Sequence, residues 1–332
     1  MQFLDFSALE HNALYFKNLL GGSRLCAVVK NDAYGHGIAH VARYLDNVVD
    51  CFAVGSIDEA RQIGFVSKDV LILIPQGLAN TQTAINDDYI LSLDSFETLN
   101  TILAACAKTD RAARVHIKLD SGMSRLGFKP SDVEKLVFAL RKNPQIAVEG
   151  VYSHFYNGNT VDCDKQLGVF LPCAQVIESA LNKRLIKHIA NSGGALLSNR
   201  YHLDMARIGL GLYGYGDDNL IPVKTARAKV VAVKDVCKGD VVGYGANFKA
   251  DCNLRIAVVN VGYAHGFART LTGSQVLVNG VKCRTVAVCM AMIMVDVSKA
   301  VVEVGDEVTL LGKGVNISND VVSVYELLCN LK

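Results

Sequence analysis

The chain has 332 residues, of which 51% are hydrophobic and 20% are charged, a composition typical of folded proteins and far from that of disordered chains. Its net charge is only +2, and without a long run of like charges we expect no nucleic-acid or other polyanion partner. At about 100 to 200 residues per domain, the length predicts two domains, or one barrel with an appendage.

The sequence shows no sign of export or membrane insertion. The first residues, MQFLDFSALEHNALYF, lack the basic start and apolar core of a secretory signal. The apolar runs, such as 70–75, are strand-sized, whereas a membrane span needs about 18 apolar residues. Ten cysteines are scattered without a CxxC pair or a Cys/His cluster at zinc spacing, so we predict no metal site. We expect a cytoplasmic protein with most cysteines buried as thiols.

From residue 24 to about 215, short apolar runs alternate with turns and amphipathic stretches. Helical spacing occurs between several of the runs, as over 95–108, 130–142 and 164–183. Continuous apolar runs are typical of parallel strands covered on both faces, and eight strand-then-helix repeats favour a closed parallel barrel over an open sheet. The eight predicted strands are 24–30, 51–56, 70–75, 89–94, 114–120, 148–155, 185–191 and 202–209.

After about residue 220 the helical spacing ends and apolar and polar residues alternate. Asn279-Gly280, between two such runs, predicts a two-residue hairpin. One short helix is predicted at 323–331. The fold class is therefore α/β, with a (β/α)8 TIM barrel over residues 1–220 and a mostly antiparallel β domain over 221–332.

Active sites of parallel barrels are built by the loops that follow the strands. Lys30 ends the first apolar run, CAVVK, where burial disfavours an ammonium and suits a Schiff-base lysine. A lysine that caps a strand and points to solvent is the more common outcome of this pattern. Polar residues also follow later strands: Lys118, Asp120, Arg125, His154, Asn191, Ser192 and Arg207.

Two glycine turns favour a phosphate site. NSGG follows the seventh predicted strand and RIGLG follows the eighth, the position where barrels often bind phosphate. Glycine is also the ordinary residue of any tight turn, so the turns alone are weak evidence. A buried lysine and a phosphate site in one barrel mouth together suggest pyridoxal 5'-phosphate (PLP).

The sequence VVKNDAYGHG resembles the signature around the PLP lysine of alanine racemases. LDSGMSRLGF, EGVYSHF, IANSGG, ARIGLGLYG, VGYGANF, VNVGYAHGFAR and VAVCMAMIMVDVS follow in the family's order and at similar spacings. The resemblance spans almost the whole chain. It implies a PLP barrel followed by a β domain, and an isomerase that interconverts L-alanine and D-alanine for peptidoglycan synthesis.

The resemblance implies two catalytic bases. Lys30 corresponds to the lysine that binds PLP and acts on one face of the substrate, and Tyr263 to the tyrosine that acts on the other face from the partner subunit of a homodimer. Racemisation needs both, because a proton leaves one face of the α-carbon and returns to the other. A phenol ordinarily titrates near about pH 10, so it must be activated, and His154 and Arg207 correspond to the residues behind it.

Other correspondences concern the cofactor and the substrate. Arg207 also corresponds to the arginine that faces the pyridine nitrogen, Arg125 to an arginine near the substrate carboxylate, and Lys118 to a lysine that is carbamylated in many members. Met290 corresponds to a backbone contact with that carboxylate. The remaining cofactor-site residues are Tyr34, Asn191, Ser192, Gly209 and Leu210. Taken singly, the tyrosines could be packed aromatics, His154 a core histidine and Gly209 a turn glycine.

The chain departs from the family's pattern at several positions. His265 stands where the family usually has Asp, and Ala287 and Ala291 stand in place of Arg and Asp. The chain also stops at Lys332, before the segment that carries a further family tyrosine. The resemblance places these positions in the substrate entryway and at one phosphate contact. We therefore expect side chains larger than methyl to be tolerated better than usual, and PLP to be held less tightly.

Two alternatives come from other functional classes. One is a different activity of the same fold, either a racemase of serine or basic amino acids or a decarboxylase, which Cys289 near the β-domain motif keeps open. The other is a non-catalytic PLP-binding protein. Carriers of this fold resemble the barrel alone, so the β domain with Tyr263 argues against that second alternative.

Overall fold

The computed structural model describes residues 1–315 and 324–331, which form two compact units. The barrel unit comprises Leu9–Ala33 and Gly37–Leu220. The β unit comprises Met1–Ala8, Tyr34–His36 and Ile221–Lys332. The sequence predicts that all of residues 1–220 belong to the barrel domain, whereas the structure groups two short segments of that range with the β unit.

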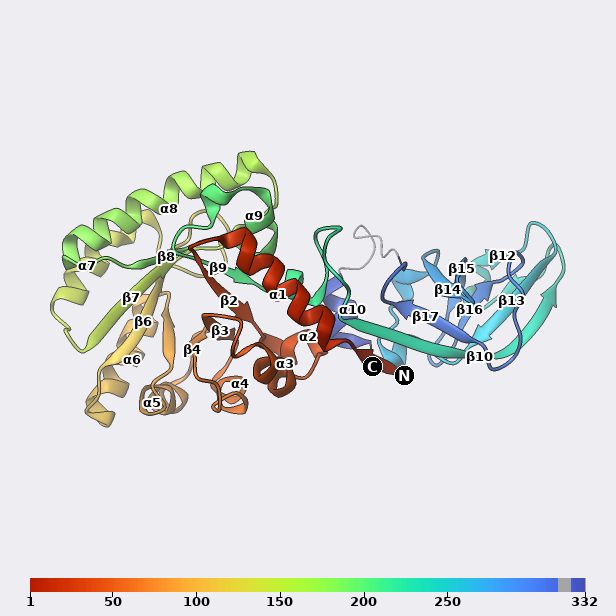
Figure 1. Cartoon of the computed structure of the whole chain (residues 1–332), viewed down its shortest axis with the longest axis horizontal. Helices are drawn as coiled ribbons and strands as arrows, with labels where there is room; N and C mark the ends of the chain where they lie inside the picture. Colours follow the sequence, from red (N-terminus) through yellow and green to blue (C-terminus); the bar gives the residue numbers. More distant parts are fainter. Residues whose placement is uncertain (316–323, 332) are drawn as a thin grey trace. The chain divides into compact units, whose positions relative to one another are not determined.

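The barrel unit is built on eight parallel strands in the order β8-β7-β6-β5-β4-β3-β2-β9 (Figure 1). Arg207 N donates to Ala190 O and Asp204 N to Lys187 O, at 3.0 and 3.1 Å, which closes the barrel beside β8 and β9. The eight predicted strands are confirmed as β2 (Arg24–Val28), β3 (Cys51–Val54), β4 (Asp69–Ile72), β5 (Ile90–Leu93), β6 (Ala113–Lys118), β7 (Ile146–Tyr152), β8 (Ile186–His188) and β9 (Met205–Ile208).

Helices surround these strands (Figure 1). Several begin at a side-chain cap that the sequence encodes: Ser56 Oγ accepts from Glu59 N, Ser95 Oγ from Thr98 N, and Asn159 Oδ1 from Asp162 N. The helices are α1 (Phe6–Leu20), α2 (Lys30–Gly35), α3 (Ile38–Leu45), α4 (Ile57–Gln62), α5 (Leu78–Asn86), α6 (Phe96–Thr109), α7 (Val133–Arg141), α8 (Thr160–Leu181) and α9 (Ser192–Leu197).

The interior of the barrel is polar. Side chains alternate along a strand, so Arg114, His116 and Lys118 of β6 share one face, while Val115 and Ile117 on the other face are fully buried. His116 on β6 lies within hydrogen-bonding distance of His188 on β8, which is the next strand but one, with β7 between them. Barrel interiors are usually filled by branched apolar residues, so this polar column marks the interior as functional.

The β unit contains a seven-stranded antiparallel sheet in the order β1-β10-β13-β16-β15-β14-β17, and β10 also pairs with β17. The sheet therefore closes on itself, with β1 added at β10. Asn279 and Gly280 both have positive φ, 50° and 79°, and form the predicted hairpin. The strands are β1 (Gln2–Leu4), β10 (Lys224–Val236), β13 (Leu254–Val259), β14 (Gln275–Val278), β15 (Val281–Val288), β16 (Ile293–Asp296) and β17 (Glu307–Leu311), beside the pair β11 (Val241–Val242) and β12 (Phe248–Lys249).

The predicted terminal helix is present as α10 (Val324–Asn330) in the β unit. Lys224 is 1% exposed, and its ammonium donates to Leu328 O and Leu331 O at 2.8 and 3.1 Å. A cation at this end of a helix satisfies carbonyls that have no partner within the helix.

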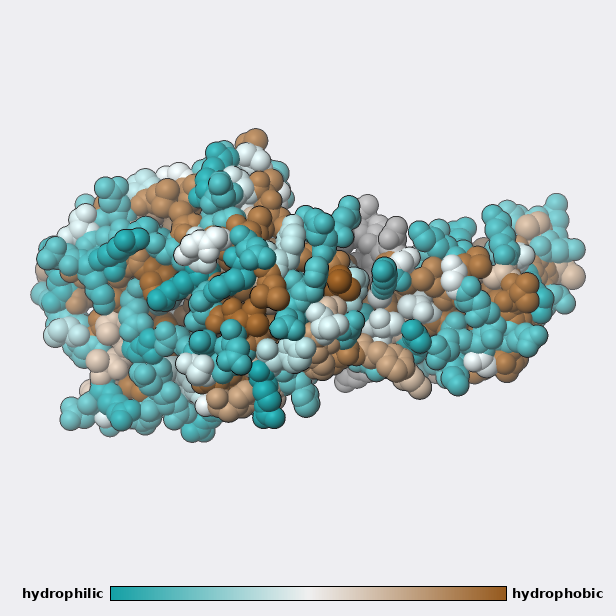
Figure 2. Space-filling model, in the orientation of Figure 1, coloured by the Kyte–Doolittle hydropathy of each residue, from teal (hydrophilic) through white to brown (hydrophobic). Residues whose placement is uncertain are grey.

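Hydrophobic and hydrophilic residues are interspersed over the visible face of each unit (Figure 2). Among the described residues, no helix combines the length and apolar character that a membrane crossing requires.

Candidate active site

Lys30 begins a left-handed turn directly after β2. Asn31, Asp32, Ala33 and Tyr34 all have φ between 51° and 55°. A left-handed turn of non-glycine residues costs roughly 1–2 kcal/mol per residue, so the surrounding structure must hold it. Such strain is concentrated at functional sites, and here it fixes the direction of the chain immediately beyond Lys30.

Two carboxylates of the barrel unit anchor this turn. Glu59 Oε1 accepts from Asn31 N at 2.6 Å, and its Oε2 accepts from Gly55 N at 2.7 Å. Asp32 Oδ1 accepts from Ile38 N at 2.8 Å, at the start of α3. Hydrogen bonds from amides to a charged acceptor are about twice as strong as neutral ones, so Glu59 holds the amide next to Lys30 firmly against β3.

Arg207, on β9, is the centre of the barrel's polar network. It is 4% exposed; Nη1 donates to His188 Nδ1 at 2.7 Å, and Nη2 donates to Ser153 O at 2.7 Å and to His154 Nδ1 at 3.1 Å. No carboxylate of the described residues forms an ion pair with it. Burial lowers the pKa of Arg207, but a guanidinium remains charged in proteins.

Arg207 fixes the tautomers of both histidines. A guanidinium has only donors, so His154 and His188 must each accept at Nδ1 and, when neutral, carry their proton on Nε2. Burial, reinforced by the charge of Arg207, lowers the pKa of both rings well below the ordinary value. His154 thus presents an Nε2–H donor beside a permanent cation.

Lys118, the last residue of β6, lies in the same cluster. Burial, and then the charges of Arg207 and Arg125, lower the pKa of Lys118 to about 8. Its ammonium lies 5.3 Å from the centre of the Tyr152 ring, and the Tyr152 hydroxyl is 2.6 Å from Ser92 Oγ. At pH 7 about a tenth of Lys118 is therefore neutral amine, and the rest is charged.

The predicted site residues of the barrel unit converge. Lys30, Arg125 and Arg207 all lie close enough for their charges to act on Lys118, and all four act on His154. The carboxylate of Asp94 acts in the opposite direction and raises the pKa of Lys118. The carboxyl end of the barrel is thus a concentrated cationic site, which favours an anionic ligand.

The two glycine loops predicted to bind phosphate are joined by Ser192. Its Oγ accepts from Gly209 N at 3.2 Å and from Gly211 N at 3.0 Å. Asn191 caps α9 by accepting from Gly194 N at 3.0 Å. Both lone pairs of the Ser192 hydroxyl are engaged, so its hydrogen is directed away from the two loops as a donor. Leu210 follows Gly209 as the first residue of a short 3₁₀ helix, Leu210–Tyr213.

Tyr34 groups with the β unit, although it follows the Lys30 turn in sequence. Its ring packs on that of Tyr325, with 5.6 Å between the ring centres. Burial, together with Tyr325 and Cys329, raises the pKa of Tyr34, so its phenol stays protonated and serves as a hydrogen-bonding group.

Tyr263 and Met290 lie on two loops of the β unit that bind each other. Tyr263 N donates to Cys289 O at 3.1 Å, and Ala264 N donates to Met290 O at 3.0 Å. A Cβ on Gly262 would overlap Cys289 O and Met290 O, so only glycine permits this approach. The side chains of Tyr263 and Met290 are 42% and 59% exposed.

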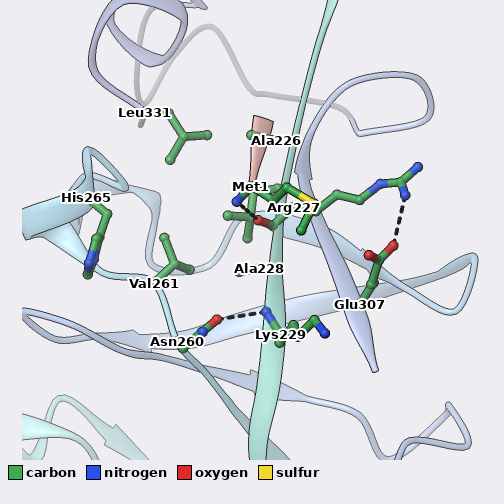
Figure 3. A pocket seen from close by; sticks show the side chains of 11 residues that line it. Met1, Ala226, Arg227, Ala228, Lys229, Asn260, Val261, His265, Glu307 and Leu331 are labelled. Carbon is green, nitrogen blue, oxygen red and sulfur yellow. Dashed lines mark hydrogen bonds and ion pairs between the residues drawn. The ribbon is translucent and has the colours of Figure 1, made fainter. Parts of the chain in front are cut away.

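His265, which replaces the usual Asp, retains one capping contact. Its Nδ1 accepts from Gly262 N at 3.2 Å, a role that a carboxylate could also fill. The ring lies at a pocket whose wall includes Val261, Asn260 and Met1 (Figure 3).

Comparisons with known proteins agree with this geometry. The family description "Alanine racemase, N-terminal domain" matches residues 4–217, and "Alanine racemase, C-terminal domain" matches residues 223–332. The chain belongs to the alanine racemase family. The expected family and the fold it implied, a (β/α)8 barrel followed by an antiparallel β domain, are confirmed.

Individual alanine racemases match the chain over most of its length. That of Pasteurella multocida is 35% identical over 353 residues, covering 98% of this chain and 94% of the relative. That of Oceanobacillus iheyensis is 34% identical, covering 93% and 87%. Among solved structures, the alanine racemase of Pseudomonas aeruginosa has a TM-score of 0.90 at 31% identity, covering 100% of this chain and 96% of that one. The enzyme of Streptomyces lavendulae has a TM-score of 0.90 at 28% identity, covering 100% and 94%.

Several residues of the candidate site were not predicted from the sequence. Glu59, His116, Tyr152 and His188 support Lys30, Lys118 and Arg207. None stands at the end of a predicted strand, although Tyr152 and His188 are the last residues of β7 and β8 in the structure. The signal that could have found two of them is the alternation in RVHIKLD and LIKHIAN, where a polar residue stands at an inward position of a buried strand.

Proposed function

We propose that this chain interconverts L-alanine and D-alanine by two-base racemisation with PLP, from Lys30 in the barrel unit and Tyr263 in the β unit. The observation that carries the proposal is the barrel cluster, in which Lys30 stands among Arg207, Lys118 and Arg125 with the neutral His154. This cationic cluster suits PLP, which carries a phosphate, together with an amino-acid substrate, which carries a carboxylate.

The residues present fit PLP. Lys30 supplies the amine that the aldehyde requires, and Ser192 supplies a hydroxyl donor at the two glycine loops. These loops leave no space for side chains of their own: a Cβ on Gly194 would lie 2.6 Å from the Phe155 ring, and one on Gly211 would overlap Phe16. Gly209 and Leu210 lie on the second of these loops, where barrels often bind phosphate through backbone amides. Gly209 N donates to Ser192 Oγ, so Leu210 N is the amide proposed for the phosphate.

When bound, PLP withdraws electrons from the substrate α-carbon and makes its proton removable. Arg207 is proposed to face the pyridine nitrogen. A guanidinium stays charged and cannot donate a proton to that nitrogen, so the ring withdraws electrons less strongly than it would beside a carboxylic acid. A moderate electron sink favours reversible proton transfer over side reactions.

Tyr263 is proposed to act from a second copy of the chain. In one chain it lies on an exposed surface that also carries apolar side chains, among them Val241, Tyr244, Met290 and Met292. Burial of such a patch against a second copy is typical of a homodimer. His154 then offers its Nε2–H to the phenolate oxygen and stabilises the deprotonated form of Tyr263.

Substrate binding is proposed to use Arg125, with Met290 contributing its backbone. Since the pKa of Lys118 is about 8, its neutral amine can add CO₂ and release a proton, giving a carbamate. That group would replace a cation by an acceptor beside Arg125 and fix the orientation of the guanidinium.

The test of the reaction is proton NMR of the PLP-loaded protein with L-alanine in D₂O, following both α-deuterium exchange and D-alanine formation. Exchange with inversion supports two-base racemisation. Exchange without inversion would refute the role of Tyr263, and no exchange would refute the alanine assignment. A cytoplasmic location and a role in peptidoglycan supply stay predictions, and the ten free thiols support a reducing compartment.

A further inference from the structure

The opposite end of the barrel holds a cavity that the proposed reaction does not use. We call it the lower cavity; it has a volume of about 360 Å³ and is lined by apolar side chains together with Arg24, Asp69, His116, Glu149 and Lys183. Arg24 and Asp69 are the first residues of β2 and β4. The lower cavity therefore opens at the amino ends of the strands, away from Lys30 and the glycine loops.

A hydrogen-bond chain of fixed direction leads from Arg207 to this cavity. Since His188 accepts from Arg207 at Nδ1, its proton is on Nε2, which lies 2.9 Å from His116 Nδ1. His116 thus accepts at Nδ1 and, as a neutral ring, carries its own proton on Nε2. Burial first, and then Arg114 and Arg207, lower the pKa of His116 to about 3, so the ring is neutral at physiological pH.

This series of hydrogen bonds ends at His116 Nε2–H, a donor without an acceptor. His116 is 2% exposed, and its Nε2 is buried with no hydrogen-bond partner among the described residues. A buried polar group left unpaired costs about 1–3 kcal/mol. Because His116 lines the lower cavity, an acceptor for Nε2–H would approach from that side.

The charges around the lower cavity favour an anion as that acceptor. Its two carboxylates are already bound: Asp69 and Glu149 each lie 2.8 Å from the guanidinium of Arg114. Arg24 and Lys183 form no ion pair with a carboxylate in the described part of the chain. A buried N–H donor and two cations with no carboxylate partner share one concave site.

We propose that the lower cavity binds a small inorganic or carboxylate anion, which accepts the Nε2–H of His116 between Arg24 and Lys183. The occupant completes a chain that runs through His116 and His188 to Arg207. Hydrogen bonds in such a chain polarise one another, so the anion makes His188 Nδ1 a better acceptor and holds Arg207 more firmly. This last consequence rests on the proposed function, because it concerns the arginine assigned to the pyridine nitrogen.

Bromide is the first probe, because its anomalous scattering identifies it in crystals of the PLP-loaded protein. The proposal expects a bromide peak within hydrogen-bonding distance of His116 Nε2. The double variant Arg24→Met/Lys183→Met should lose the peak, whereas Lys135→Met, which removes an exposed lysine on α7, should keep it. Water alone at His116 would overturn the proposal, as would a peak that survives the double variant, which would be an adventitious ion only.

Chloride NMR gives a measurement in solution. The wild-type protein and the Lys135→Met control should broaden the ³⁵Cl signal more than the double variant does. Equal broadening by all three proteins would contradict a specific site. Coupling to Arg207 is then tested by chloride titration of the absorbance of bound PLP, where the wild type should show a change that the double variant lacks. Anion binding is read without turnover, so its failure is distinguishable from a failure to racemise alanine.

Discussion

The two units present their proposed catalytic residues in opposite ways. In the barrel unit, Arg207 and Lys118 are 4% and 6% exposed, and His154 is held by Arg207. In the β unit, Tyr263 and Met290 are 42% and 59% exposed. In the barrel unit, hydrogen bonds already hold the proposed catalytic side chains in place. In the β unit, hydrogen bonds hold the backbone of the Tyr263 loop, but the side chains of Tyr263 and Met290 are exposed.

The difference follows from what each fold must satisfy. Most polar groups inside a barrel find hydrogen-bond partners, and Arg207, His154 and His188 order one another through their mutual bonds. The Tyr263 loop is ordered through its backbone, by the contact of Gly262 with the Cys289 and Met290 carbonyls. The proposed site is therefore complete only when the Tyr263 surface of one copy meets the barrel of another.

The largest expected effect comes from mixing two inactive variants, which tests whether the Lys30 and Tyr263 of one site come from different subunits. Lys30→Ala and Tyr263→Phe should each lower racemisation by about 10³-fold or more, because each removes one of two required bases. If Tyr263 acts in the partner subunit, refolding the two variants together at equal concentration should restore about a quarter of wild-type activity. Half of the dimers are then mixed, and each mixed dimer has one intact site of two.

The control for this experiment is the double variant Lys30→Ala/Tyr263→Phe mixed with wild type. In each mixed dimer of that pair, one site has Tyr263 replaced and the other has Lys30 replaced, so no mixed dimer gains a complete site. No recovery from the two single variants, with dimers shown by sedimentation, would mean that Lys30 and Tyr263 act within one chain.

The sequence predicted the fold well, and the strand-end residues that it singled out in the barrel lie near one another, for a physical reason. Continuous apolar runs and the Asn279-Gly280 turn are local signals, and loops after barrel strands are a fixed place to look for chemistry. The roles of Tyr263 and Met290 came from resemblance to a family, since exposed residues in an antiparallel domain carry no local signal. His116 and His188 were missed because their bond joins residues 72 positions apart in sequence, on two strands that do not pair with each other.

Gly150 tests whether the barrel half is held by packing around His116. An ideal Cβ on Gly150 would lie 2.7 Å from the His116 ring, so Gly150→Ala must displace the ring or the strand. We expect a loss of about 2 kcal/mol in the free energy of unfolding, measured by urea denaturation, with reduced activity because the chain to Arg207 is disturbed. The spectroscopic signal of the β unit should stay close to that of the wild type until the urea concentration at which the protein unfolds.

Gly168→Ala is the matched control. Gly168 lies inside α8 with open space around its Cβ position, so alanine should stabilise the helix by up to about 1 kcal/mol. We therefore expect the free energy of unfolding to fall in Gly150→Ala and to rise in Gly168→Ala. A neutral Gly150→Ala would show that the His116 ring is loosely held and that the barrel network is not the rigid half of the site.

Acid sensitivity should also belong to the barrel unit. The pKa of His116 falls from 6.5 to about 3 on folding, chiefly through burial, and those of His154 and His188 are lowered too. Below about pH 6.5 these histidines bind protons in the unfolded chain but stay neutral in the folded barrel. The free energy of unfolding therefore falls as the pH drops toward 4. His116→Gln should reduce that slope by about 1.4 kcal/mol per pH unit, measured by urea denaturation between pH 6 and 4.

His40→Gln, on the exposed side of α3, is the comparison for this slope and should leave it unchanged. The slope is a difference within each protein, so it remains informative even where a variant has lower stability at every pH. Equal slopes for wild type and His116→Gln would show that His116 is already protonated in the folded barrel, which would reverse the direction of the hydrogen-bond chain.

The smallest expected effect lies in the exposed half, at the positions that depart from the family's pattern. Ala291 lines an apolar groove of the β unit with Met290, Met292 and Tyr244, and a small apolar residue there removes a charge that the family usually carries. We expect Ala291→Asp to shift the ratio of kcat/KM for alanine over serine by about tenfold toward alanine, because discrimination by one pocket group amounts to about 1–3 kcal/mol. If wild type already shows negligible activity on serine, the groove does not broaden specificity, and Ala291 is a neutral replacement on the surface proposed to meet a partner subunit.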